Sequence, residues 1–358
     1  MILFDVPFLP DAGYADFLRE RADRLHSIHF RLEGGLQLDS RHDYTGWSEG
    51  DLLSRLREVP GVRKYALLNS RFYAPGHYFD AEFWRGLIAK LARLAEAGQL
   101  DGVVFADHYL LQGLADAAPD LCAGLEAVPS ANCLIDSFDG IVAWRQYVAA
   151  TGFQPPAKII LDRNLNRSLP QLGEISSRCR QQYPDLILTL LGNEGCLYRC
   201  PFKLAHDAHI ALANTGLTAE RCGAMNDSFG CRRYFTAHPE AVLQSPLIRP
   251  ENLGRYRGLV KVVKLCGRSL GVDFLQRVID AYLAGAYSGN LLALADTTDW
   301  LAEQLYVANE LLPEDFFDTL ASCDRECGGC RYCRQVLKGC IKKKPLRLKD
   351  WRRQGNVL

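Results

Sequence analysis

Two groups of cysteines carry the clearest chemical signal in the sequence. The first group follows an apolar run, LILTLL, and has the spacing C-x3-C-x21-C-x8-C: Cys196, Cys200, Cys222 and Cys231. Four thiolates can hold a [4Fe–4S] cluster or a structural zinc ion, and the spacing leaves both open. The start of the group approaches the C-x3-C-x2-C motif of radical-SAM enzymes. Lys203 stands at the third position, however, and cannot act as a thiolate ligand.

The second group lies near the C-terminus in CDRECGGCRYCRQVLKGC. Cys327, Cys330 and Cys333 form C-x2-C-x2-C, the compact spacing that wraps a cubane cluster in bacterial ferredoxins. The fourth cysteine of the ferredoxin pattern is absent, and Cys323 or Cys340 is the candidate fourth ligand. We therefore predict a second [4Fe–4S] cluster or a zinc ion here.

The other cysteines are expected to pack as small buried side chains, because free cysteine behaves as a small apolar residue. These are Cys122, Cys133, Cys179 and Cys266. Cys266 differs from the rest because it stands at the end of a predicted strand. His206 and His209 share one face of a predicted helix and are expected to be surface residues or indirect supports of the first metal site.

The composition is that of a globular protein, with 358 residues, of which 48% are hydrophobic and 23% charged. The 42 basic residues balance the 42 acidic ones, so global charge favours neither nucleic acid nor membrane as a partner. The N-terminal MILFDVPFLPDAG lacks a basic leader region, and no apolar run is long enough to span a membrane. We expect a cytoplasmic protein, whose thiols stay reduced and available to metals.

The basic run KKKPLRLKDWRR, at 342–353, is the exception to the even charge distribution. A solvated tail is one interpretation. A contact with RNA, lipid or protein, assisted by Trp351, is the other.

Apolar runs alternate with helical patterns along the chain, and such alternation predicts a (β/α)8 barrel of TIM type. The expected strands are 2–8, 27–32, 65–69, 102–106, 125–129, 157–161, 185–191 and 259–265. The expected domains are a barrel over 1–288, with a cysteine-bearing insertion at 192–245, and a helical, cysteine-rich extension over 289–358 that ends in the basic tail.

Polar residues follow the predicted strands, where barrel enzymes carry their chemistry. They are Arg31, Asn69, Arg71, Asp107, His108, Ser130, Asn132, Asp162, Arg163, Asn193, Glu194 and Arg268. The arginines indicate an anionic ligand, since guanidinium groups bind carboxylates in pairs of hydrogen bonds. Arg163, Arg268 and Arg31 are candidate carboxylate clamps. The candidates for proton transfer are Asp162, Glu194 and His108.

Four stretches resemble the U32 family of collagenase-like peptidases, and together they cover roughly residues 125–287. They are ANCLIDSFDGIVAWRQY, KIILDRNLNRSLPQLGEI, the region from LTLLGNEGCLYRC to CGAMNDSFGCRRYF, and SPLIRPENLGRYRGLVKVVKLCGRSLGVDFLQRVIDAYLAG. The resemblance implies a (β/α)8-type barrel with a [4Fe–4S] cluster on the first group of four cysteines. Arg268 takes the place of the family's Gly-Arg arginine. Cys266 replaces the usual acidic residue, the spacing of the first cysteine group differs from the family's, and the C-terminal cysteine loop is not a general family feature.

The better understood members of that family resemble oxygen-independent hydroxylases or their partners. They act on RNA bases or a quinone precursor, and some take oxygen from prephenate. The resemblance therefore implies an iron–sulfur oxidoreductase, an oxygen-independent hydroxylase or a related redox enzyme, with a small anionic or RNA substrate.

Two alternatives remain open. The first is a non-catalytic iron–sulfur partner or electron-transfer subunit, working with an electron donor or a homologous protein. The second is a peptidase, although the sequence lacks the Gly-x-Ser-x-Gly and His-Glu-x-x-His motifs.

Overall fold

The computed structural model describes residues 1–33, 37–41, 46–217 and 222–342, and its centre is a sheet of eight parallel strands. The strand order is β5-β4-β3-β2-β1-β8-β7-β6, so the first strand pairs with the last and the sheet rolls into a barrel. The strands are β1 (Leu3–Pro7), β2 (Leu25–Arg31), β3 (Arg63–Leu68), β4 (Gly102–Phe105), β5 (Glu126–Pro129), β6 (Lys158–Ile160), β7 (Ile187–Leu191) and β8 (Val262–Lys264). The predicted (β/α)8 fold is confirmed, and each of these eight strands overlaps a predicted one.

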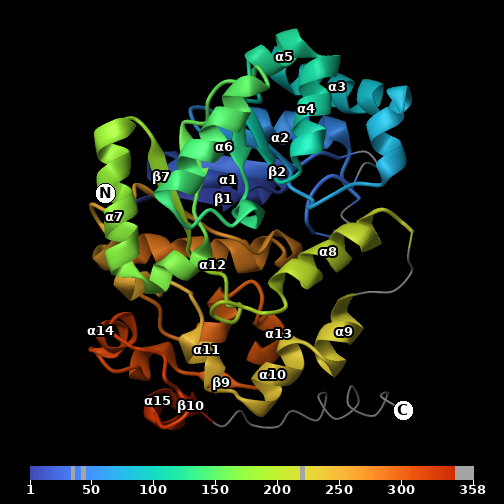
Figure 1. Cartoon of the computed structure of the whole chain (residues 1–358). Helices are drawn as coiled ribbons and strands as arrows, with labels where there is room; N and C mark the ends of the chain where they lie inside the picture. The colour runs from blue at the N-terminus through green and yellow to red at the C-terminus, as the bar shows by residue number, and fades with distance from the viewer. Residues whose placement is uncertain (34–36, 42–45, 218–221, 343–358) are drawn as a thin grey trace.

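Helices connect successive strands around the outside of the barrel (Figure 1). They are α1 (Ala12–Arg19), α2 (Glu49–Arg57), α3 (Ala81–Glu96), α4 (His108–Ala117), α5 (Pro119–Ala123), α6 (Phe138–Ala150), α7 (Leu169–Gln182) and α12 (Val272–Ala284). Local capping explains several of their starts. The Ser48 side chain accepts a hydrogen bond from the backbone N–H of Asp51, and the Asp51 carboxylate accepts one from the backbone N–H of Ser48. The Ser137 side chain caps α6 by accepting from the backbone N–H of Gly140.

The barrel has a seam between β5 and β6, where the described residues form no continuous strand ladder. Side chains and a single bridge hold it instead. The backbone N–H of Ala157 donates to Glu126 Oε2 at 3.2 Å, and Glu126 also pairs with Arg63 of β3. A parallel bridge joins Glu126 to Gln154.

The barrel interior contains a charged layer and an apolar layer. Asp5, His29, Lys158 and Lys264 are all buried, and Asp5 Oδ2 lies 2.9 Å from Lys158 Nζ and 3.4 Å from Lys264 Nζ. Burial opposes ionisation of Asp5, yet the two lysines outweigh it and hold its pKa well below the usual value. The apolar layer consists of Tyr65, Leu67, Val104, Val128, Ile160 and Leu191.

The segment after β7 and the segment after α12 pack together below the barrel (Figure 1). Their helices are α8 (Lys203–Asn214), α9 (Cys222–Ser228), α10 (Cys231–Ala237), α11 (Ala241–Gln244), α13 (Asp299–Ala302), α14 (Phe316–Ala321) and α15 (Tyr332–Cys340), and a small hairpin pairs β9 (Tyr306–Val307) with β10 (Ile341–Lys342). One buried cluster contains Phe235 and Leu243 from the first segment and Val307, Phe316 and Leu337 from the second. The predicted insertion and the predicted C-terminal extension therefore share an apolar core.

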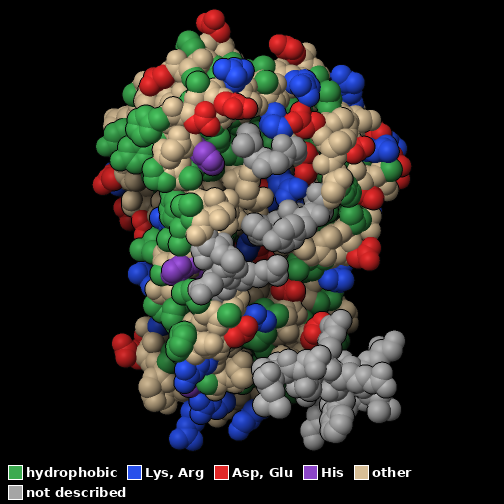
Figure 2. All heavy atoms as spheres, turned by 90° about the vertical axis from the view of Figure 1, so that its right-hand side faces the viewer, with side chains coloured by type: hydrophobic (Ala, Val, Ile, Leu, Met, Phe, Trp, Pro, Cys, Tyr) green, Lys and Arg blue, Asp and Glu red, His purple; other side chains and the backbone are tan. Residues whose placement is uncertain are grey.

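Lys and Arg side chains gather at the lower edge of the molecule in Figure 2, below the barrel. The predicted basic run begins at Lys342, which pairs with Glu310 at 2.6 Å, and its remainder lies outside the described residues. Within the described part of the chain, every helix is too short or too polar to cross a membrane.

Asp5→Asn tests the charged layer of the barrel. The substitution leaves Lys158 and Lys264 buried beside each other without their carboxylate. We expect the free energy of unfolding to fall by about 3–5 kcal/mol, the usual cost of breaking a buried ion pair. Denaturant unfolding gives this value, with the exposed Asp23→Asn as the control. Equal stability of the two variants would contradict this account of the layer.

Candidate functional site

Arg163 and Glu194 form a buried ion pair at the carboxyl ends of neighbouring strands β6 and β7. Asp162 comes two residues after the end of β6 and caps the short 3-10 helix η4 (Arg163–Arg167) by accepting from the backbone N–H of Asn164 at 2.8 Å. The cap fixes the start of η4 and with it the position of Arg163. The sequence prediction placed these three residues at the barrel mouth, and the structure brings Arg163 and Glu194 into direct contact.

The first cysteine group begins at this ion pair. Cys196 Sγ lies 3.4 Å from Glu194 Oε1, the same oxygen that pairs with Arg163. Burial raises the pKa of the Cys196 thiol and Glu194 adds to the rise, while Arg163 opposes it. Glu194 Oε2 is buried and has no hydrogen-bond partner among the described residues. A carboxylate with one oxygen held and the other available is suited to receive a ligand or a proton.

Asp296 is the residue of the mouth that sequence reasoning missed. It lies far along the chain, before α13, and its backbone N–H donates to Asn193 O at 3.1 Å. Gly195 permits this approach, because a Cβ at that position would lie 2.8 Å from Thr298 Oγ1. The Asp296 carboxylate pairs with Arg41 at 3.0 Å, and its Oδ1 has no hydrogen-bond partner among the described residues. The surrounding letters, ALADTTDW, contain no motif that marks a site.

Burial raises the pKa of Asp296 to about 7, against the effect of Arg41 and with a further rise from Glu194. The positive charges of Arg41 and Arg163 act on the carboxyl groups of both Asp296 and Glu194. Cys266 lies near the same charged side chains. Burial and the Asp296 charge raise the pKa of its thiol to about 12. The mouth thus combines a carboxyl group that titrates near neutral pH with two thiols and two guanidinium groups.

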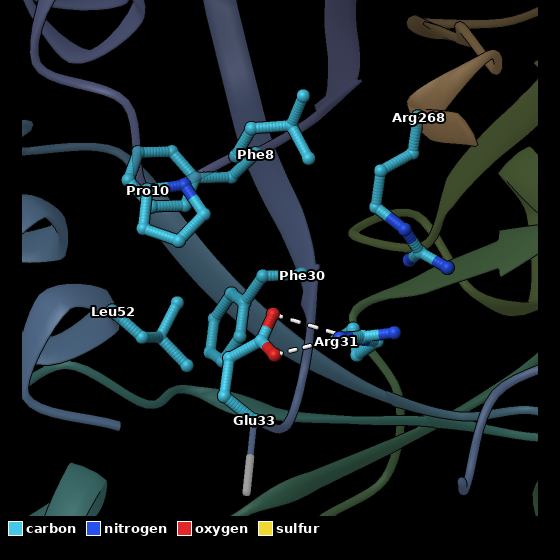
Figure 3. Close-up of a pocket in the computed structure, with 8 residues that line it drawn as sticks. Phe8, Pro10, Phe30, Arg31, Glu33, Leu52 and Arg268 are labelled. Atoms are coloured by element: carbon cyan, nitrogen blue, oxygen red, sulfur yellow. Dashed lines mark hydrogen bonds and ion pairs between the residues drawn. The ribbon is translucent and has the colours of Figure 1, made fainter. Parts of the chain in front are cut away.

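Arg268 lies on the other side of the mouth and pairs with Asp39 at 2.7 Å. It lines a cavity at the ends of β1 and β2 together with Arg31, which pairs with Glu33 at 2.7 Å. Figure 3 shows the two guanidinium groups on one side of this cavity, with Pro10 and Leu52 on the other. Arg31 and Arg268, two of the three predicted carboxylate clamps, are therefore each paired with a carboxylate of the chain itself.

His108 lies apart from the ion pair at the mouth. Its ring packs against Phe105 and against Trp144 and Tyr147 of α6, at centroid distances of 6.0–6.2 Å. Burial lowers its pKa. Its role in proton transfer stays a prediction, and this packing does not favour it.

Lys203 Nζ lies 3.2 Å from Asn132 Oδ1 and pairs with Asp207, which also lies 3.5 Å from Arg71. These polar groups join α8 to the ends of β3 and β5. Lys203 therefore has a structural role in joining α8 to the barrel. It lies outside the predicted set of cysteine ligands.

The remaining cysteines of the first group lie on the insertion. Cys200 and Cys231 are both partly buried, and burial raises the pKa of each thiol. Cys231 Sγ donates weakly to Asn226 Oδ1 at 3.9 Å, and Asn226 Nδ2 lies 3.1 Å from His206 Nε2. His206 thus touches the group through Asn226. The side chain of Cys222 lies outside the described residues.

Cys323, Cys327, Cys330 and Cys333 of the second group line a single cleft of about 740 Å³. Cys340 does not line that cleft. It is buried, and its Sγ donates to Leu311 O at 3.2 Å. Within the described residues, no three His, Cys, Asp or Glu side chains have converged far enough to hold a metal ion at either site. The donor sets remain those that zinc and iron–sulfur clusters use.

Asp296→Asn tests the titrating carboxyl group. A folded-state pKa of about 7, above an unfolded value of about 3.9, means that the folded protein keeps a proton that the unfolded chain has released. This contribution to stability is complete below about pH 4 and disappears as the pH rises through 7. The variant should therefore gain stability relative to wild type by about 1.4 kcal/mol per pH unit across that range. Denaturant unfolding at several pH values measures it, with Asp139→Asn, whose side chain is 86% exposed, as the flat control.

Comparisons with known proteins give a relative but no matching family model. The relative is an uncharacterized protease, MJ1657, of Methanocaldococcus jannaschii, which is 31% identical over 247 residues, covering 68% of each chain. Among solved structures, the U32 peptidase Mk0906 is 17% identical with a TM-score of 0.48, over 74% of this chain and 92% of that one. A putative deoxyribose-phosphate aldolase from Coccidioides immitis is 11% identical with a TM-score of 0.30, over 52% of this chain and 70% of that one.

The 31% identity across two thirds of both chains confirms the resemblance that the four sequence segments indicated. The chain belongs to the U32 peptidase family.

Proposed function

We propose that this chain is an iron–sulfur redox enzyme of U32 type that acts on a small anionic substrate at the barrel mouth. The observation that carries the proposal is the 3.4 Å contact between Cys196 Sγ and Glu194 Oε1. The contact joins the first cysteine of the insertion to the charged residues at the strand ends. The metal ligands and the substrate-binding groups would then belong to one site.

The donor chemistry fits an iron–sulfur cluster, because Cys196, Cys200 and Cys231 are soft sulfur ligands on one insertion. The side chain of Cys222, the fourth candidate, is undescribed. Arg163 lies within electrostatic range of Cys196 and Cys200 and would favour their thiolate forms. Once bound, a [4Fe–4S] cluster supplies one-electron chemistry to the site.

The residues of the chain itself would bind and orient the substrate. Arg163 and Arg41 present positive charge toward the mouth, and an anionic substrate could replace part of their present carboxylate pairing. Asp296 would hold or release a proton near neutral pH through its available Oδ1. Glu194 Oε2 is the second position for a proton. Oxygen-independent hydroxylation is the reaction that the family resemblance favours for this arrangement.

The peptidase alternative receives less support. Among the described residues, Ser27 and His26 form a serine–histidine contact, in which Ser27 Oγ lies 3.1 Å from His26 Nδ1. Ser27 is fully buried inside the barrel and accepts a hydrogen bond from Lys158, so a peptide cannot reach it. The relative from Methanocaldococcus jannaschii is named a protease, and that name applies to the relative.

Cys231→Ala tests the cluster. Protein purified and reconstituted without oxygen should lose about four iron and four sulfide per chain in this variant, together with one EPR signal. Cys122→Ala is the matched control, because Cys122 is buried and donates to Leu114 O at 3.5 Å, away from the insertion. Iron content that is equal in both variants, or zinc in place of iron at this site, would remove the redox proposal.

Prephenate is the probe for the anionic substrate, since the family resemblance suggests it as an oxygen donor. Calorimetric titration should show binding that Arg163→Gln weakens by about 10–100-fold, the loss expected for a charged hydrogen bond. Arg255→Gln, which breaks an exposed pair with Asp318, should leave it unchanged. Binding without any oxygen-independent conversion of the probe would favour a non-catalytic partner role.

A further inference from the structure

The C-terminal cysteine cluster (Cys323, Cys327, Cys330 and Cys333) faces a cleft between the C-terminal segment and the insertion. The opposite wall contains Tyr198 and Phe202, which flank the first cysteine group. Cys327 and Cys330 are exposed, so the sulfur atoms are accessible to solvent. The proposed barrel-mouth function has no use for these four thiols.

All four side chains line the one cleft, although they have not converged to coordination distance in the described part of the chain. Cys340 does not line the cleft, because its side chain is buried and its Sγ donates to Leu311 O at 3.2 Å. The sequence left Cys323 and Cys340 as equal candidates for a fourth ligand, and the placement of the side chains favours Cys323.

The backbone of the loop already turns around the first sulfur. The N–H of Arg325 donates to Cys323 Sγ at 3.3 Å, and the N–H of Cys327 donates to Arg325 O at 2.9 Å. Arg325 has a left-handed φ of 68°, an uncommon conformation for a residue with a side chain. Backbone N–H donors to sulfur stabilise thiolate ligands, and such donors tune metal centres of this kind.

A buried positive charge lies at the inner wall of the same cleft. Arg167 is only 8% exposed and donates from Nε and one terminal nitrogen to Ser245 O, at 2.9 and 2.7 Å. No carboxylate among the described residues pairs with it. It lines the cleft together with the four cysteines and the cation Arg325. A buried guanidinium requires a counter-charge, since its desolvation is costly.

Arg325 connects these two features. One of its terminal nitrogens donates to Arg167 O at 2.7 Å, and its guanidinium lies 4.5 Å from the centre of the Tyr198 ring. The same residue therefore shapes the loop around Cys323 and ties it to the barrel beside Arg167. Two cations next to four thiols form an environment for an anionic sulfur centre.

We propose that the C-terminal cysteine cluster is a tetrathiolate metal centre and that Arg167 is its buried counter-ion. Each thiol loses its proton as a metal–sulfur bond forms, so a Zn²⁺ ion bound by four thiolates carries two negative charges. A [4Fe–4S] cluster on the same four thiolates is also anionic. Both would balance Arg167 and Arg325, and both would fix the C-terminal segment against the barrel.

Cys323→Ser and Cys340→Ser, made in the full chain, test the ligand set. Metal content is measured by elemental analysis, and Co²⁺ serves as a spectroscopic probe of tetrahedral thiolate coordination. Cys323→Ser should lose the metal of this site, and Cys340→Ser should keep it. Equal metal content in the two variants, or loss in Cys340→Ser alone, would overturn the proposal. Acid-labile sulfide that disappears with Cys323→Ser identifies a cluster, and zinc without sulfide identifies a zinc site.

Arg167→Met tests the counter-ion. Competition with a chelator should show metal affinity reduced by about 10–100-fold, the usual effect of removing a group that supports metal ligands. Arg167→Lys should restore most of the affinity, because it keeps the charge. Arg334→Met is the matched control, since Arg334 lines the same cleft but pairs with Glu240 at 2.8 Å. Unchanged affinity in Arg167→Met would exclude the counter-ion role.

The two metal proposals fail separately. Cys231→Ala removes only the barrel-mouth metal, and Cys323→Ser removes only the metal of the C-terminal cysteine cluster. A chain that keeps one metal and never binds the other supports one proposal and rejects the other.

Discussion

The side chain of Asn193 holds the barrel mouth together. It is fully buried, and its Nδ2 donates to Cys266 O at 2.9 Å and to Leu294 O at 3.0 Å, while its Oδ1 accepts from Cys266 N at 2.7 Å. One amide therefore joins the ends of β7 and β8 to the segment that follows α12. An amide suits this position because it offers both donors and an acceptor. The placement of Asp296 beside Glu194 depends on these bonds.

At the barrel mouth the arginines are paired with carboxylates, but two carboxylate oxygens lack a hydrogen-bond partner among the described residues. Arg163, Arg41 and Arg268 each have a carboxylate from the chain, yet one oxygen of Glu194 and one of Asp296 remain without a partner among the described residues. Buried polar atoms usually find partners, so such exceptions in one place indicate a site for a ligand. The charges come from several loops, as is usual at the mouth of this fold.

The strands and the first side of the mouth could be predicted from the sequence. Continuous apolar runs mark strands that are buried on both faces, and GVVFA at 102–106 became β4 on this basis. Arg163 and Glu194 could be found because each lies within a few residues of the end of its strand. Asp296 could not, because it reaches the mouth through a backbone contact with Asn193 made across a long stretch of chain. Periodicity and spacing carry no information about such a contact. The proposal of Cys323 rather than Cys340 as a fourth ligand likewise rests on the packing of α15, which buries Cys340.

The apolar core shared by the insertion and the C-terminal segment has a consequence for how the protein is made. Phe235 and Leu243 leave the ribosome well before Phe316 and Leu337, their partners in the core. During synthesis the strands of the barrel can begin to pair, since domains tend to fold as the chain emerges. The insertion can complete its core only after residues 316–337 have been synthesised. Its folding therefore follows the synthesis of the C-terminal segment and not that of the neighbouring strand β7.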